Sequence, residues 1–166
     1  MNPSNPEKKM SADFPRHGDI LATESGANFT AVDVGETAGL MRYGVDHPLG
    51  RTLWGKVFLK EPLGLTGMEI SLGVVPPGAS IPFFHRHHQN EETYLFLRGK
   101  GEFQVDGRVI RVHEGTAVRV APAGVRAFRN TGDDGLFYVV VQAKAGTLSQ
   151  WTGSDGSGVP GEVTWP

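Results

Sequence analysis

Short β-prone segments recur at regular spacing between Gly67 and Ala143, and this spacing constrains the fold more than any other feature of the chain. The segments read MEISLGVV, IPFFHRHH, ETYLFLR, EFQVD, RVIRV, TAVRVA, VRAFRN and LFYVVVQA. Glycine, proline and aspartate lie between them, and Asp106-Gly107 suits a tight hairpin turn. Many short strands at this spacing predict an all-β sandwich or barrel.

The segment ETYLFLR is apolar on both faces, because Leu95 and Leu97 oppose Tyr94 and Phe96. We therefore expect its outer face to be covered by N-terminal strands or by a second subunit.

The preceding region, residues 28–65, also favours strands, in the segments FTAVDV, LMRYGV and TLWGKVFL. It shows no long 3.6-residue period and no series of capped amphipathic helices. The pattern therefore argues against an N-terminal helix-turn-helix domain and against a DNA-binding regulator.

The length of 166 residues fits one domain. A net charge of −2 gives no basic field for nucleic acid. The absence of cysteine removes disulfides, thiol catalysis and thiolate metal sites. The longest apolar run, 136–141, is far shorter than the about 20 residues of a membrane-spanning helix. We expect a soluble, cytoplasmic protein without nucleic-acid or membrane partners.

Both ends of the chain differ in composition from its middle. Residues 1–27 are polar, broken by prolines and without the apolar stretch of a signal peptide, which predicts a partly flexible arm. Residues 149–166 form a Gly/Ser-rich tail that carries Trp151 and Trp165. Two tryptophans are unusual in a disordered tail, so we expect part of it to fold back onto residues 28–148 or onto a partner subunit.

Three of the six histidines lie within four positions, in the sequence His85-Arg86-His87-His88. Strand alternation would place His85 and His87 on one face and His88 on the other. By the same rule Glu92 projects from its own strand together with Tyr94. If the two strands are neighbours, a carboxylate meets two imidazoles, which is a set of ligands for a divalent ion such as iron, manganese, nickel or zinc.

This stretch resembles the first motif of the cupin superfamily, in which Gly, His-x-His, Glu and Gly follow one another. Gly78, His85, His87, Glu92 and Gly99 occupy those places, with one residue more after Gly78 than the usual pattern has. Glu92 fits the spacing to Gly99 better than Glu91 does. The resemblance implies a double-stranded β-helix of jelly-roll type, a single barrel with core motifs in residues 66–143 and, as is common in the family, a homodimer.

The second cupin motif is only partly matched, by Gly115, Pro122, Gly124 and Asn130. The motif's histidine is missing. Counting from Gly124 places Ala127 there, and counting back from Asn130 places Arg126 there. The fourth ligand of the family's metal site is therefore absent, and either residue could take its place.

The resemblance also implies a ligand pocket, for which Phe83, Tyr94, Phe96 and Arg126 are the candidate lining residues. A guanidinium there could clamp a carboxylate or phosphate, although a surface charge is the simpler role for Arg126. Tyr94 is a candidate general acid, as tyrosines are in some metal-free cupins. The loop GVDHPLG could lean over the barrel mouth and bring His47 there, although a solvated loop position is the commoner outcome.

Three functions remain open at this stage. The first is a metal-dependent enzyme, dioxygenase-like or isomerase-like, with an ion on His85, His87 and Glu92 that acts on a small molecule. The second is a metal-free cupin for a small anionic ligand, and the third is a barrel that only binds or assembles. Because cupins carry many activities on one fold, the sequence leaves open whether the protein is an enzyme.

Overall fold

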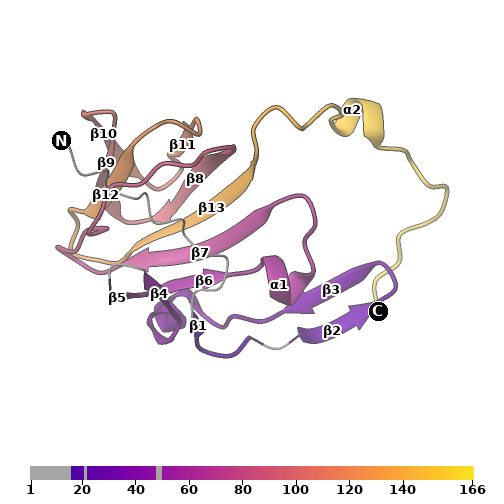
Figure 1. Ribbon diagram of the computed structural model, residues 1–166. Coiled ribbons are helices and arrows are strands. Elements are labelled where there is room, and N and C mark those ends of the chain that lie inside the picture. The colour runs from indigo at the N-terminus through magenta and orange to yellow at the C-terminus, as the bar shows by residue number, and fades with distance from the viewer. Residues whose placement is uncertain (1–15, 21, 48–49) are drawn as a thin grey trace.

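The computed structural model describes residues 16–20, 22–47 and 50–166 (Figure 1). The N-terminal elements are β1 Arg16–His17, β2 Ala22–Gly26, β3 Phe29–Val32, the 3-10 helix η1 Thr37–Arg42, β4 Gly44–His47, β5 Arg51–Trp54, β6 Lys56–Phe58 and α1 Lys60–Leu63. The remaining elements are β7 Glu69–Val75, β8 Asn90–Arg98, β9 Lys100–Val105, β10 Arg108–His113, β11 Ala117–Val120, β12 Arg126–Asn130, β13 Leu136–Lys144 and α2 Thr152–Asp155.

Two antiparallel sheets form the barrel. One has five strands in the order β11-β8-β13-β7-β6, and the other has three in the order β10-β9-β12. Their inner faces share one apolar core, in which Phe103 of β9 stacks on Phe128 of β12 at 5.7 Å between ring centroids. Tyr94, Phe96 and Tyr138 of the larger sheet meet Phe128 edge-on. The predicted all-β, jelly-roll class is confirmed.

The hairpin between β9 and β10 turns at the predicted dipeptide. Asp106 and Gly107 have φ values of 49° and 80°, and two successive positive φ angles are what a tight hairpin of this hand requires.

Residues 81–89 do not form the strand expected for IPFFHRHH. They lie beside β12 and meet it through an isolated bridge at His85, with another bridge just before them at Ser80. The expected alternation nevertheless holds, because His85 and His87 are partly buried while Arg86 and His88 are exposed. Pro82 and the sparse pairing explain why the segment has the side-chain alternation of a strand without the hydrogen-bond ladder of one.

The N-terminal elements pack against the outer face of β7 and β13. Leu40, Tyr43 and Val57 bury Val74 and Phe137 in a second apolar cluster. Two expectations for this region were wrong. The first part of LMRYGV belongs to the 3-10 helix η1, and TLWGKVFL is divided into β5 and β6 at Gly55, whose φ is 81°.

The described residues leave the outer face of β8 without such a cover, since Leu97 is 52% exposed and Leu95 is also exposed. The described N-terminal strands therefore do not cover this face, and a second subunit stays a prediction. The tail does not fold back onto the barrel but runs towards the β2–β3 hairpin (Figure 1) and leaves Trp151 and Trp165 exposed. Its contact with a partner subunit, the other expectation, stays a prediction.

Residues 1–15, which hold most of the expected N-terminal arm, lie outside the described residues. In the described ranges, no helix has both the length and the apolar character needed to cross a membrane.

Candidate functional site

The two histidines of the site are held by backbone hydrogen bonds to the start of β12 and to the turn before it. The backbone amide of Arg126 donates to the carbonyl of His85 (3.1 Å), and the amide of His85 donates back to Arg126 (3.3 Å). The amide of His87 donates to the carbonyl of Pro122 (2.9 Å). These bonds fix both imidazoles on the side that faces the barrel interior.

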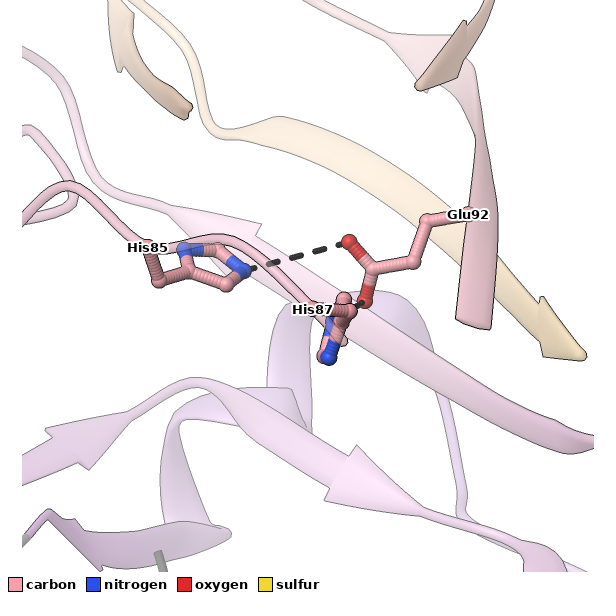
Figure 2. Close-up of side chains that lie close together, drawn as sticks. All are labelled: His85, His87 and Glu92. Atoms are coloured by element: carbon pink, nitrogen blue, oxygen red, sulfur yellow. Dashed lines mark ion pairs between the residues drawn. The ribbon is translucent and has the colours of Figure 1, made fainter. Parts of the chain in front are cut away.

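Glu92 reaches the two imidazoles from β8 (Figure 2). Its Oε1 lies 3.1 Å from Nε2 of His87, and its Oε2 lies 3.8 Å from Nε2 of His85. One donor atom from each of the three residues can be chosen so that all lie within 4.8 Å of one another. The structure thus brings together the three residues that the sequence singled out as metal ligands.

The two oxygens of Glu92 have different partners. Oε2 accepts hydrogen bonds from the Tyr94 hydroxyl (2.5 Å) and from the Arg126 guanidinium. Oε1 faces His87 and the side chain of Gln142. Oε2 is therefore occupied by two close protein donors, whereas Oε1 accepts the longer bond from the Gln142 amide (3.2 Å) and is the oxygen directed towards His87.

These contacts control the protonation of the site. Burial alone would raise the pKa of Glu92, but its contacts with His85 and His87, with the Arg126 charge and with the Tyr94 hydroxyl hold that pKa well below its usual range. Burial lowers the pKa of His85 and, with the charge of Glu92, raises the pKa of Tyr94. At neutral pH the carboxylate is ionised, the His85 ring is neutral and the phenol keeps its proton.

Arg126 takes the place of the missing fourth ligand, which decides between the two residues that the sequence left open. Its side chain is 1% exposed and pairs with Glu92, so the surface role considered for it was wrong. The guanidinium also donates to the carbonyl of Gly124 (3.1 Å). The expectation that Arg126 lines the cavity was wrong, because the guanidinium lies behind the carboxylate.

Gln142 is a site residue that the sequence analysis missed. It pairs with Glu92 across β13 and β8, and its Nε2 lies 2.8 Å from Nε2 of His87 and 3.2 Å from Oε1 of Glu92. The signal was present, because Gln142 is a polar residue at an inward position of the apolar segment LFYVVVQA. If the Gln142 amide is rotated by half a turn, its oxygen replaces its nitrogen beside the site and becomes a further possible metal ligand.

A cavity of about 550 Å³ adjoins the site, and His85, His87, Glu92 and Gln142 form part of its wall. Phe83 and Tyr94 line it as expected. Phe96 does not, because it points into the aromatic core and is buried there. His47 also lines the cavity, stacked on Phe83 at 4.0 Å between ring centroids. The solvated loop position expected for His47 was wrong, since it ends strand β4.

The donor set fits a divalent ion in its chemistry. Two imidazole nitrogens and a carboxylate oxygen are ligands for iron, manganese, nickel and zinc, and the neutral His85 ring is the form that binds a metal. The Nδ1 atom of His85 is buried without a hydrogen-bond partner among the described residues, so nothing there competes for the ring. The positive charge of Arg126 beside Glu92 opposes the ion and lowers its affinity.

The fold and the site together define a small β-barrel protein with a two-histidine, one-carboxylate centre beside a cavity. Residues 71–142 match the cupin domain family. The crystal structure of a cupin protein from Bacteroides fragilis is 40% identical, with alignment over 63% of this chain and 89% of that chain and a TM-score of 0.61. The chain belongs to the cupin family.

Two other crystal structures are less similar. A Cupin 2 conserved barrel domain protein from Salinispora arenicola is 27% identical over 48% of this chain and 66% of that chain, with a TM-score of 0.43. A predicted oxalate decarboxylase from Thermotoga maritima is 25% identical over 45% of this chain and 64% of that chain, also with a TM-score of 0.43. Among the curated proteins no match is found.

Proposed function

We propose that His85, His87 and Glu92 hold a divalent metal ion and that the adjoining cavity binds a small molecule on which the ion acts. The observation that carries the proposal is the convergence of three donors, within 4.8 Å of one another, at the wall of a cavity of about 550 Å³. Such an ion supplies Lewis acidity towards a carbonyl, or activation of oxygen. Both dioxygenase-like and isomerase-like reactions are compatible with this chemistry.

The surrounding residues would orient the ligands. Tyr94 and Arg126 bind Oε2 of Glu92 and fix the carboxylate, which leaves Oε1 directed towards His87. A carboxylate held in this way loses little freedom when it binds an ion. Tyr94 lines the cavity, but its hydroxyl donates to Glu92 and burial raises its pKa, which opposes the general-acid role considered for it and favours a role in orienting the carboxylate.

A metal-free binding module for a small anionic ligand is the second candidate. It is favoured by the buried Arg126–Glu92 pair, because the guanidinium already neutralises the one ionised carboxylate of the site. With that charge balanced, the site is stable without a dication.

Thermal unfolding with added Mn²⁺, Fe²⁺, Ni²⁺ or Zn²⁺ separates the two candidates. An ion at 100 times its Kd should stabilise the folded chain by about 2.7 kcal/mol. The His87→Ala variant should lose this effect, and the exposed His88→Ala variant should keep it. If no ion raises the Tm of the native chain, the metal-free candidate replaces the first.

A further inference from the structure

Lys56 is a charged residue in the cavity that the proposed metal chemistry does not use. It lies on β6 and pairs with Gly73 of β7, which pairs in turn with Tyr138 of β13. A side-chain carbon at Gly73 would lie 2.2 Å from the Tyr138 ring, so the ring fills the space that the glycine leaves. The Lys56 amine lies over that ring, 4.9 Å from its centroid.

The amine has no anionic partner within the described part of the chain. Its contacts are the faces of Tyr138 and of Phe58, the latter at 5.4 Å. Burial lowers the pKa of Lys56, and the charges of Glu92 and then Glu69 raise it. Glu92 is paired with Arg126, and Oε1 of Glu69 accepts hydrogen bonds from the backbone amides of Leu59 and Lys60. A half-buried ammonium held only by aromatic faces can gain a charge-assisted hydrogen bond from an anion in the cavity.

Strand register connects Lys56 to the metal-ligand set through one floor of the cavity. Three successive rows of side chains project from the same face of the larger sheet. The first row is Lys56, Gly73, Tyr138 and Phe96, the second is Phe58, Ser71, Val140 and Tyr94, and the third is Glu69, Gln142 and Glu92. All of these except Gly73 and Phe96 line the cavity.

The outer rows are four residues apart along the strands, which corresponds to about 13 Å between backbones. The side chains at both ends reach into the cavity and shorten this distance. The row between them offers an aromatic ring and an aliphatic side chain, Phe58 and Val140, with Ser71 as a small polar group. A molecule that spans the floor therefore needs a polar group at each end and a mainly apolar body.

We propose that Lys56 binds the carboxylate or phosphate group of an elongated small molecule whose other end lies at His85, His87 and Glu92. This inference rests on the proposed small-molecule function of the cavity and names its ligand class, organic oxyanions with an apolar body. Lys56 is then a specificity-determining residue, because a neutral analogue would leave its ammonium without an anionic partner.

The test compares hexanoate, hexyl phosphate and 1-hexanol as probes, by calorimetric titration of the full-length protein with and without bound Zn²⁺. The native chain should bind at least one of the two anions about tenfold or more tightly than the alcohol. Lys56→Met should lose that preference, while Lys56→Arg should keep it. The matched control Lys144→Met, at an exposed lysine of β13, should also keep it.

Because a metal ion can itself bind an anion, the comparison after removal of Zn²⁺ is decisive. A preference that depends on Lys56 in the metal-free protein supports the inference. Equal binding of anions and alcohol by the native chain, or a preference that persists in Lys56→Met, would overturn it. If Lys56→Met fails to fold, the comparison of the anions with the alcohol on the native chain can still refute the inference.

The Zn²⁺ content of the same samples separates this inference from the proposed function. Stoichiometric Zn²⁺ without an anion preference refutes the role of Lys56 and leaves the metal site standing. An anion preference that requires Lys56, in a chain that binds no Zn²⁺, supports Lys56 and refutes the metal site.

Discussion

The placement of Lys56 predicts that this single side chain makes stability depend on pH in the alkaline range. Burial lowers the pKa of Lys56 from 10.5 to about 8, against the opposing effects of Glu92 and Glu69. Between these two values the unfolded chain binds more protons than the folded chain. The free energy of unfolding must therefore rise with pH through this window.

The magnitude follows from the same shift. Each unit of pKa corresponds to about 1.4 kcal/mol, so the full window from about 8 to 10.5 corresponds to about 3.5 kcal/mol. Below pH 8 the ammonium is present in both states, and the folded chain bears the whole cost of burying it. A Lys56→Met variant removes the charge and keeps much of the apolar stem, so it should be more stable than the native chain at pH 7 by up to this amount.

Urea unfolding, followed by tryptophan fluorescence from pH 6 to 10, measures the effect. The quantity of interest is the difference in unfolding free energy between Lys56→Met and the native chain, which should shrink as the pH rises through 8. Tyr138, which faces Lys56, and Tyr94 have pKa values raised by burial and by Glu92. They lower stability only near and above pH 10, and they do so in both chains.

Lys144→Met, at an exposed position, should show no pH-dependent difference from the native chain. A difference for Lys56→Met that stays constant across this range would refute the buried-amine reasoning. So would a variant that is less stable than the native chain at pH 7, since it would mean that the ammonium already has a strong partner.

Two further substitutions test the packing around the site and in the core. Arg126→Met leaves the ionised Glu92 buried without its cation and should lower the free energy of unfolding in urea by about 3–5 kcal/mol. The double variant with Glu92→Gln should recover much of that loss. If the losses of the two single variants simply add, the ion pair is contradicted. Phe103→Ala opens a cavity in the aromatic core and should cost about 3–5 kcal/mol, whereas the exposed Phe84→Ala should change stability by about 0.5 kcal/mol or less; similar losses in both variants would contradict the assignment of the core.

The sequence predicted those parts of the fold that depend on local patterns. The β-prone segment that forms β13, the Asp106-Gly107 turn and the alternation of side chains at His85 and His87 are all properties of neighbouring residues, and the structure retains each of them. The prediction that Glu92 meets the two histidines came from the family motif. Periodicity alone does not say which segments lie side by side.

The positions of side chains that depend on the pairing of strands distant in the chain could not be predicted from the sequence. Arg126 looks like one of several arginines until the pairing of β12 places it behind Glu92. Lys56 looks like an ordinary charge in TLWGKVFL, and only the row Lys56–Gly73–Tyr138 shows that its amine lies inside the cavity. The tail tryptophans predicted burial that the single chain does not provide.

The most direct test of the proposed metal centre is the metal content of untagged protein, measured by elemental mass spectrometry after expression with iron, manganese, nickel and zinc. The native chain and His88→Ala should carry a stoichiometric divalent ion, and His85→Ala and Glu92→Gln should lose it. No ion in the native chain, or an ion that persists in both ligand variants, would contradict the proposed site at His85, His87 and Glu92.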